Sequence, residues 1–377
     1  MDFRLTPEQE MLRKVVKEFA ETEVKPKVVK IDKTGKMPEE LIKRLAELGL
    51  IGLGVPEAYN GSGMGFIERA IAVEELGKVC AGLAAFLFNT YLGIDVISQG
   101  SEEQKKKYLP PIIKAEKKVT VAVTEPTGGS DPTALKSTAK LDGDFYVLNG
   151  RKCFISGADM ADIYCVGVKT GEGPTDIGAF ICERSDSIRP GRIEEHTGFK
   201  GLNIAELIID NCRIPKENLI GEEKRGLGIL LKAITTAGRM GHAALALGIA
   251  EGAYEAALKF AKERILYGKP IIELQAIQFM LADMFTQIEA TRWLTYYAAW
   301  LLDNVSAREA SIHVAKAKLF ATETARNVAI NAIKIHGGYG TLPEYHVVRY
   351  LRDTLEQLAA GGTNEIMRVI IASSLKR

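Results

Sequence analysis

The sequence has few of the features that mark secreted, membrane-embedded or metal-binding proteins. Its five cysteines are scattered and include no C-x-x-C pair; they are Cys80, Cys153, Cys165, Cys182 and Cys212. An odd, dispersed set argues against a disulfide framework and against a zinc site, and is typical of a reducing cytoplasm. No apolar run reaches the ~18 residues that a membrane span requires, and the opening residues form no apolar signal region. We therefore expect a cytoplasmic protein with no metal and no membrane contact.

The chain also has no excess of positive or negative charge. The chain has 49 basic and 48 acidic residues, which leaves a net charge of +1. This balance offers no general attraction to nucleic acid or to an anionic membrane. Internal repeats and low-complexity linkers are absent as well. A chain of 377 residues, 46% hydrophobic and 26% charged, is that of a globular protein with two or three domains, or with one large multi-layer fold.

Helical periodicity is present in the first part of the chain. Thr6 is placed to cap a helix that starts at Pro7, and Ser101 opens a capping box whose helix we expect Pro110-Pro111 to end. From Val119 the texture changes to short β-branched and aromatic runs separated by Asp-Gly, Asn-Gly and Pro-Gly turns, which predicts a β domain.

After Gly226 long amphipathic segments return, at 227–265, 272–303, 306–336 and 343–374. Helices of this length with short connections predict an antiparallel bundle. The sequence thus predicts an α+β multidomain protein. Its parts are an N-terminal all-α domain (1–118), a middle β-barrel or β-sandwich domain (119–225) and a C-terminal four-helix bundle (226–377).

The most informative segment follows the β-rich run Val119–Ala122 and reads Val-Thr-Glu-Pro-Thr-Gly-Gly-Ser-Asp over residues 123–131. A strand that ends in such a loop presents bare backbone N–H groups and hydroxyls, which suit the polar edge of a cofactor ring or a pyrophosphate. A Gly-Gly-Ser-Asp segment can also be a simple turn.

The order T-E-P-x-G-G-S-D resembles the first signature of the acyl-CoA dehydrogenases, flavoenzymes that oxidise CoA thioesters. A second segment, His336-Gly337-Gly338-Tyr339-Gly340, is similar to the family's H-G-G-x-G signature, and the α–β–α order matches its architecture from end to end. The same glycines also serve as a helix C-cap. The family usually has Gln where this chain has Lys334, which affects one hydrogen bond to the cofactor.

The resemblance implies FAD as the cofactor. The positions that match cofactor contacts are Val121, Val123, Thr124, Gly129, Ser130, Phe154, Ser156, Arg264, Tyr267, Gln275, Lys334, Gly337, Gly338, Thr363 and Glu365. The positions implied to contact substrate are Ser130, Tyr91, Arg239 and Gly362. Several of the cofactor contacts are made in the family to the FAD of an adjacent subunit, which implies a homotetramer.

A carboxylate base near the acyl chain is missing from its usual places. The family's usual chemistry removes a proton from Cα and needs such a base. Most members carry it in Tyr-Glu-Gly-Thr, and here the matching stretch is Ala360-Gly361-Gly362-Thr363, with glycine in place of Glu. Other members place it directly before the arginine that aligns with Arg239, and here that position is Gly238. The Gly361 N–H would still bind the thioester carbonyl.

Three residues are candidates for a replacement base. Asp95 lies on an apolar segment that lines the acyl pocket in the family, one turn from Tyr91, with which it could share a hydrogen bond. It could equally be a solvated residue on the far face of that helix. His242 follows Gly238 by one turn, although a histidine there is more often a buried core residue. Glu365 ranks third, because its family role is with the cofactor.

The missing base is similar to that of a subgroup acting on alicyclic CoA thioesters such as cyclohex-1-ene-1-carboxyl-CoA. The leading hypothesis is therefore an FAD-dependent dehydrogenase that carries out a 1,4-elimination on a cyclic acyl-CoA, with Asp95 as base and electron-transferring flavoprotein as acceptor. The alternatives are an enoyl-CoA reductase, another elimination such as desulfination on the same fold, and a non-catalytic flavin- and CoA-binding subunit.

Overall fold

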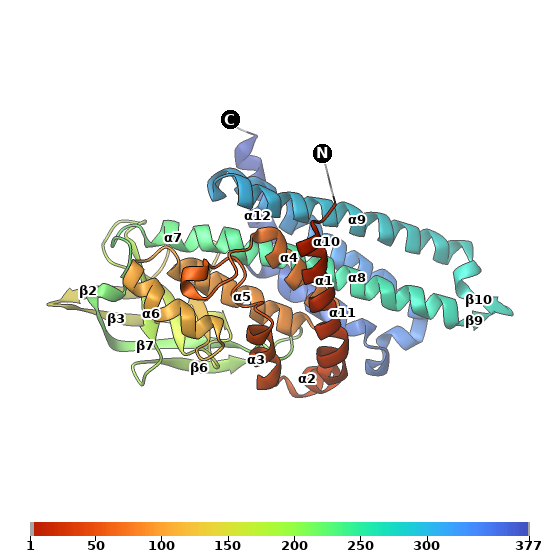
Figure 1. The fold of residues 1–377 in the computed structure, drawn as a ribbon, viewed down its shortest axis with the longest axis horizontal. Helices are drawn as coiled ribbons and strands as arrows, with labels where there is room; N and C mark the ends of the chain where they lie inside the picture. Colours follow the sequence, from red (N-terminus) through yellow and green to blue (C-terminus); the bar gives the residue numbers. More distant parts are fainter. Residues whose placement is uncertain (1–3, 376–377) are drawn as a thin grey trace.

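The structure, a computed structural model, describes residues 4–375. Helices come first along the chain, then a sheet, then helices again, which confirms the α–β–α architecture predicted from the sequence. Figure 1 shows the sheet at one end of an elongated molecule. A small hairpin of β9 (Ile265–Leu266) and β10 (Lys269–Pro270) lies at the opposite end.

From residue 4 onward, the described N-terminal part contains six α-helices. They are α1 (Pro7–Phe19), α2 (Val28–Thr34), α3 (Glu39–Glu47), α4 (Phe66–Gly77), α5 (Ala81–Ile97) and α6 (Glu102–Ile113). The side chain of Thr6 accepts a hydrogen bond from the backbone N–H of Gln9 at 3.2 Å, which confirms the predicted cap of α1. Nearly every residue of α5 is buried, so this helix forms the centre of the core.

Helix α6 does not end at Pro110-Pro111, as the sequence indicated; it continues to Ile113. Proline has no amide N–H and cannot donate to a carbonyl one turn earlier. Both prolines fall in the last turn, and Ile112 and Ile113 just after them are 1% and 6% exposed. Burial of these two side chains keeps the last turn helical despite the missing hydrogen bonds.

The middle part is a mixed, mostly antiparallel sheet. Its strands are β1 (Val119–Ala122), β2 (Thr138–Asp142), β3 (Phe145–Ser156), β4 (Ile163–Lys169), β5 (Ile177–Glu183), β6 (Ile188–Glu194), β7 (Ile204–Pro215) and β8 (Leu219–Ile220). The strand order is β6-β7-β3-β2-β4-β5-β8, and β1 pairs in parallel with β4, placing Val121 opposite Cys165.

A glycine brings the central helix close to the sheet. A Cβ atom added to Gly93 of α5 would lie 2.6 Å from the side chain of Val119 in β1. Only a residue without a side chain allows this approach. The strand that leads into the T-E-P loop therefore packs directly against the helix that carries Asp95.

The C-terminal part contains the longest helices. They are α7 (Gly226–Ala233), the π-helical turn η5 (Ile234–Arg239), α8 (Met240–Glu263), α9 (Gln275–Asn304), α10 (Ala307–His336), α11 (Val347–Ala359) and α12 (Asn364–Ser374). Two of the predicted helices are therefore interrupted. The π turn breaks segment 227–265, and Gly361 and Gly362 break segment 343–374 because their φ angles of +66° and +93° are left-handed.

A buried network of charges links the N-terminal and C-terminal helices. Arg292 of α9 forms ion pairs with Glu74 of α4 and Glu251 of α8, and Lys78 binds Glu251 at 2.8 Å. Glu74 is fully buried. Burial, together with the negative charge of Glu251, raises the pKa of Glu74 to about 7, against the opposing effect of Arg292. Arg292 is thus the cation that allows two carboxylates to share one interior site.

We expect Arg292→Met to destabilise the protein by about 3–5 kcal/mol, because it leaves two buried carboxylates without their shared partner. Chemical denaturation in the presence of FAD measures the change. Arg213→Met is the matched control, since Arg213 pairs with Asp142 on the surface, where both side chains are more than half exposed, and should change little. Equal effects of the two substitutions would contradict the importance of the buried network.

Candidate active site

Asp95 lies where α5 meets the π-helical turn η5. Its Oδ1 accepts a hydrogen bond from Arg69 Nη1 at 2.7 Å, and its Oδ2 accepts one from the Thr236 hydroxyl at 2.6 Å. The side chain is only 13% exposed, so Asp95 is not a solvated surface residue. The Thr236 hydroxyl is also 3.3 Å from the carbonyl oxygen of Ala233. The Thr236 hydroxyl can therefore rotate to donate to the Ala233 carbonyl oxygen instead of to Oδ2 of Asp95.

Arg69 is held in one orientation from several sides. Its Nε donates to the carbonyl oxygen of Leu53 at 2.8 Å. Its guanidinium lies over the rings of Phe66 and Tyr91, 5.3 and 4.8 Å from their centroids. A Cβ atom added to Gly54, whose φ is +76°, would lie 2.7 Å from Arg69 Nε. Arg69 therefore packs directly against the backbone of Gly54, at a position where a side chain would clash with the guanidinium.

The predicted hydrogen bond between Tyr91 and Asp95 is wrong. The Tyr91 hydroxyl donates instead to the carbonyl oxygen of Leu50 at 2.6 Å. Tyr91 is 1% exposed, and burial raises the pKa of its hydroxyl. The carboxylate is paired with Arg69, which covers the tyrosine ring. Tyr91 thus supports the partner of Asp95 and does not bind the carboxylate itself.

The two glycines at the usual base positions differ in their surroundings. A Cβ atom added to Gly238 would meet Ile234 at 3.8 Å and Leu92 at 4.0 Å, which are ordinary van der Waals contacts, so this buried position could take a Cβ atom without displacing a neighbour. Leu92 lies one turn before Asp95 on α5. A Cβ atom added to Gly361 would instead lie 2.9 Å from Cδ2 of His242. The imidazole occupies the volume into which a side chain at position 361 would project.

His242 is buried and uncharged at neutral pH. Its ring packs edge-on against Phe88, with centroids 4.8 Å apart. Burial, with a smaller effect from the positive charge of Lys318, lowers its pKa to about 3. Nδ1 has no hydrogen-bond partner among residues 4–375. His242 is therefore a neutral group with an unused polar atom beside the Gly361 loop.

Two further basic side chains bind the loop that joins α11 to α12. Arg239 Nε donates to the carbonyl oxygen of Gly361 at 3.2 Å. Lys318 Nζ donates to the carbonyl oxygen of Gly362 at 3.1 Å and to Oδ1 of Asn364 at 2.8 Å. Arg239 was implied by the resemblance to contact substrate, and the structure places its guanidinium against this loop.

The T-E-P loop after β1 is anchored at its base and exposed at its tip. Glu125 forms a buried ion pair with Lys152 at 2.6 Å and accepts hydrogen bonds from backbone N–H groups of the segment that follows the loop. Gly129 and Ser130 at the tip are exposed. The glutamate of the signature thus holds the loop in shape, while the tip presents N–H groups and hydroxyls to a ligand.

Phe154 lies beside this loop in a strained conformation. Its φ is +57°, unusual for a residue with a bulky side chain, and it falls at a β-bulge in β3. Its ring is 68% exposed. The neighbouring Cys153 N–H donates to the carbonyl oxygen of Thr124 at 3.0 Å, which ties the bulge to the loop. An exposed aromatic ring held in this way is suited to stack on a flat ligand.

The remaining predicted cofactor residues form a second group. Tyr267, at the tip of the β9–β10 hairpin, is 90% exposed with φ +53°. Arg264 lies over the ring of Tyr339, 5.4 Å from its centroid, and Lys334, Gly337 and Gly338 are exposed nearby. This hairpin and the strand β3 that carries Phe154 lie at opposite ends of the molecule (Figure 1).

Thr363 and Glu365, the last predicted cofactor contacts, lie at the start of α12. The Thr363 hydroxyl accepts a hydrogen bond from the N–H of Ile366 and caps the helix. Glu365 is exposed, and its carboxylate binds Arg368 at 3.2 Å. Gln275 is also exposed, at the first residue of α9. Ser156, at the end of β3, is bound through its carbonyl oxygen by the Thr120 hydroxyl at 2.7 Å.

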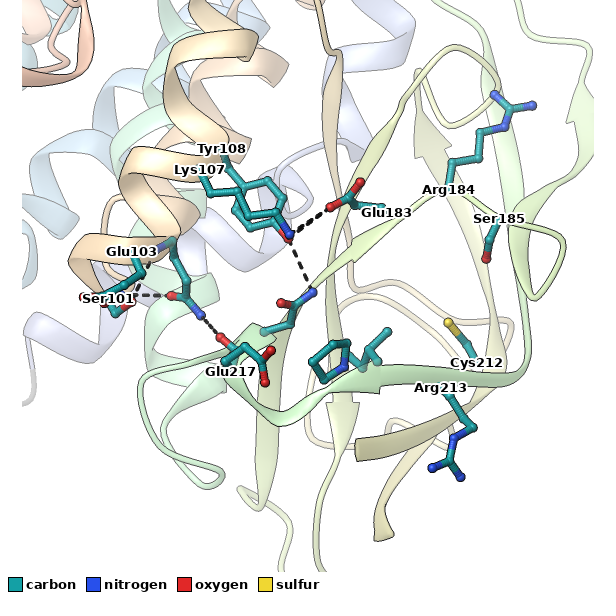
Figure 2. Close-up of a pocket in the computed structure, with 14 residues that line it drawn as sticks. Ser101, Glu103, Lys107, Tyr108, Glu183, Arg184, Ser185, Cys212, Arg213 and Glu217 are labelled. Carbon is teal, nitrogen blue, oxygen red and sulfur yellow. Dashed lines mark hydrogen bonds and ion pairs between the residues drawn. The ribbon is translucent and has the colours of Figure 1, made fainter. Parts of the chain in front are cut away.

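A cleft on the surface lies away from all of these residues. It has a volume of about 540 Å³ and is formed by α6 and the edge of the sheet. In Figure 2, Lys107 and Tyr108 of α6 face Glu183 at the end of β5 across it. The Lys107–Glu183 ion pair is 3.1 Å long. The cleft contains none of the predicted site residues.

No helix among the described residues has the length and apolar character needed to cross a bilayer. Nor does any cluster of His, Cys, Asp and Glu side chains within residues 4–375 have the makeup of a metal site.

Comparison with known proteins identifies the family. Models of the N-terminal, middle and C-terminal domains of acyl-CoA dehydrogenases match residues 6–116, 120–212 and 224–376. Acryloyl-CoA reductase (NADH) of Anaerotignum propionicum is 42% identical, covering 100% of this chain and 96% of the relative. The chain belongs to the acyl-CoA dehydrogenase family. Cyclohex-1-ene-1-carbonyl-CoA dehydrogenase of Syntrophus aciditrophicus is 39% identical over 98% of this chain and 90% of its own length.

The fold agrees with that of solved members. Butyryl-CoA dehydrogenase from Megasphaera elsdenii superposes with a TM-score of 0.97 at 37% identity, with both chains fully covered. Membership of the acyl-CoA dehydrogenase family makes the protein a flavin-dependent oxidoreductase with FAD as its cofactor. The exposed ring of Phe154 and the open tip of the T-E-P loop fit a flavin, since they offer a flat apolar face beside hydrogen-bond donors.

The sequence did not single out Arg69, Thr236 or Lys318, although each contacts a predicted site residue. Arg69 and Thr236 approach Asp95 from positions 26 and 141 residues away along the chain. One signal for Lys318 was available, because it stands at helical spacing with the small and apolar residues Val314 and Ala321. A lysine on such a face must bury its charge, which marks it as unusual.

We expect Phe154→Gly to separate stability from cofactor binding in this acyl-CoA dehydrogenase family member. Glycine adopts φ +57° without strain, so the apoprotein should unfold with a free energy about 1 kcal/mol higher. Loss of the exposed ring should at the same time lower the FAD retained per chain. Denaturation of the apoprotein measures the change in stability, and the ratio of flavin to protein absorbance measures the FAD content. An FAD content equal to that of the unaltered protein would show that the ring makes no contact with flavin.

Proposed function

We propose that the protein dehydrogenates an alicyclic CoA thioester of the cyclohex-1-ene-1-carboxyl-CoA type, with Asp95 as the proton acceptor. The observation that carries this proposal is one nearly buried carboxylate, Asp95, whose two oxygens are held by Arg69 and Thr236. Leu92, one turn before Asp95 on α5, lies 4.0 Å from the place of a Cβ atom at Gly238, so α5 packs against one of the two vacant base positions. Both usual positions of the base are glycine, and Asp95 is the acidic group that the family resemblance implies at the acyl pocket.

The reaction proposed is a 1,4-elimination. A ring C–H beyond Cα loses its proton to Oδ2 of Asp95, another ring carbon loses a hydride, and a new C=C bond forms between ring carbons. FAD, when bound, supplies the hydride acceptor at N5. The Thr236 hydroxyl, which has Ala233 as a second acceptor, turns away from Oδ2 as the proton arrives. Arg69 stays on Oδ1 and fixes the direction of the carboxylate.

The base must lie beyond Cα for this regiochemistry. The family resemblance implies that α5, which carries Asp95, lines the acyl pocket, whereas the N–H of Gly361 on the loop between α11 and α12 is expected to bind the thioester carbonyl. A general base at the right distance contributes on the order of 10²–10⁴ in rate. The similarity to a cyclohex-1-ene-1-carbonyl-CoA dehydrogenase supports the same substrate class.

A second candidate function is reduction of an enoyl-CoA, which the 42% identity to an acryloyl-CoA reductase favours. The same groups would act in reverse, with the protonated Asp95 returning its proton to the substrate. Another elimination on this fold and a non-catalytic flavin- and CoA-binding role are the remaining alternatives. Anaerobic titration of the flavin with straight, branched and cyclic acyl-CoAs and enoyl-CoAs separates the four.

The partners proposed are an electron-transferring flavoprotein and three further copies of this chain. Strand β3, which carries Phe154, and the β9–β10 hairpin lie at opposite ends of the molecule (Figure 1), and this arrangement supports the oligomer, because both elements carry residues that match contacts to FAD. A cofactor completed by a neighbouring subunit makes assembly a condition for binding it.

We expect butyryl-CoA and octanoyl-CoA to leave the flavin oxidised, because no carboxylate is placed to take a proton from Cα. Stopped-flow absorbance of the flavin under anaerobic conditions measures this. Gly361→Glu alone should remain inactive, since His242 occupies the space, while Gly361→Glu with His242→Ala should gain reactivity toward butyryl-CoA. Rapid bleaching of the unaltered protein by either straight-chain thioester would refute the proposed regiochemistry.

We expect Asp95→Asn to slow flavin reduction by cyclohex-1-ene-1-carboxyl-CoA on the order of 10²–10⁴-fold, because the amide keeps the shape but cannot accept the proton. Rapid mixing of substrate with the FAD-loaded variant gives the rate. FAD content and thioester affinity should remain near those of the unaltered protein.

His242→Gln is the matched control for Asp95→Asn, since it also replaces a polar side chain near the site by an amide and should reduce the rate only mildly. If Asp95→Asn reacts at the normal rate while His242→Gln is slow, the role of base passes to His242.

A further inference from the structure

The cleft between α6 and the sheet lies where the sheet of the middle part is not closed. Within the described chain, β8 pairs with β5 only at Ala179 and Phe180, and β6 pairs with β7 only over Ile204–Ile209. Glu183 at the end of β5 and residues 212–215 at the end of β7 therefore have no strand beside them on one side. All of them line the cleft, whose volume of about 540 Å³ is typical of a binding pocket.

Hydrogen bonds at the two strand ends indicate which backbone groups point into this opening. In an antiparallel pair, residues that bond to the partner strand alternate with residues whose N–H and C=O point away from it. The N–H of Arg184 donates to the residue just before β4, so the N–H and C=O of Glu183 point away from β4. The N–H of Lys216 donates to the residue just before β3, so those of Arg213 point away from β3. Two strand edges with unused donors and acceptors thus line one cleft.

The cleft has opposite charges at its two sides. Figure 2 shows Glu103 and Glu217 on the left and Arg184 and Arg213 on the right. The Arg184 side chain donates to the backbone carbonyl oxygen of Asp159 at 2.8 Å. Within residues 4–375, neither Arg184 nor the two glutamates form an ion pair. These three charges are available to a ligand that carries the opposite charges at its own two ends.

The cleft is apolar between its charged sides, and its walls are tied to each other. Tyr108, Cys212 and Ile214 line it with side chains that are nearly buried. Gln104 of α6 donates to the carbonyl oxygen of Glu217 at 2.7 Å, which links the helix to the segment after β7. A site held in this way needs little rearrangement when a ligand enters.

We propose that this cleft binds an extended segment of a partner protein, which adds a short strand between β5 and β7. The backbone of the segment pairs with the N–H and C=O groups of Glu183 and Arg213. Its side chains alternate between the two faces of the strand, so every second one points inward onto Tyr108. An acidic residue at one end lies beside Arg184, and a basic residue at the other end lies beside Glu217. A small molecule with two charges could reach these ends but would leave the strand edges unpaired.

The test uses isothermal titration calorimetry of the FAD-loaded protein with the peptide acetyl-Asp-Thr-Val-Thr-Val-Thr-Lys-amide. We expect saturable binding of one peptide per chain. Arg184→Glu should weaken this binding roughly tenfold, because it puts a carboxylate beside the aspartate of the peptide. Arg189→Glu is the matched control, since Arg189 also donates to a backbone carbonyl oxygen, that of Asp186 at 2.7 Å, but lies outside the cleft. It should bind the peptide as the unaltered protein does.

Two altered peptides separate the parts of the proposal. Replacing the aspartate of the peptide by lysine should restore binding to Arg184→Glu and weaken binding to the unaltered protein. Methylation of the valine backbone nitrogens removes hydrogen-bond donors and should abolish binding, because strand addition needs them. Equal affinity of the methylated peptide would assign the cleft to a small molecule with two charges and overturn the proposal. So would the absence of binding to the unaltered protein, or equal losses in Arg184→Glu and Arg189→Glu. None of these measurements uses flavin reduction, so this proposal and the proposed function can fail separately.

Discussion

The ion pair between Arg69 and Asp95 is the interaction on which the arrangement of the site depends. It joins α4 to α5, and the Thr236 hydroxyl extends the link to η5. A nearly buried carboxylate keeps its charge only where donors surround it. Arg69 in turn depends on the backbone at Leu53 and on the absence of a side chain at Gly54. The direction of the Asp95 carboxylate is therefore set by residues from three separate segments of the chain.

Much of the fold could be predicted because its signals are local. The cap at Thr6, the central α5 and the β-rich middle domain each follow from neighbouring residues. The end of α6 could not be predicted in this way, because burial of Ile112 and Ile113 outweighs the two prolines before them. The π turn also has no local signal in the sequence. The break at Gly361-Gly362 does have a signal, the two adjacent glycines, but the amphipathic pattern on either side of them favoured a continuous helix.

The candidate site could be predicted only by residue type. Asp95 and His242 stood out as titratable groups on apolar helices, but their partners come from other parts of the chain. The contact between His242 and Gly361 can be seen only in the three-dimensional structure. The ring of His242 on α8 fills the volume beside Gly361, which lies more than a hundred residues later in the chain. Where the sequence has glycine in place of glutamate, the structure has the ring of His242 in the volume that a side chain at position 361 would enter.

The π-helical turn η5 has a consequence for how this protein could change during evolution. A π turn contains one residue more than the α-helical turn that it replaces, so it amounts to a single inserted residue between α7 and α8. If all of these residues instead formed a regular α-helix, both helices would stay intact, but everything after the turn would be rotated by about 100°. Arg239 and His242 would then leave the Gly361 loop together. The chemistry of the site is thus tied to a one-residue difference in length, which a comparison of residue types alone does not detect.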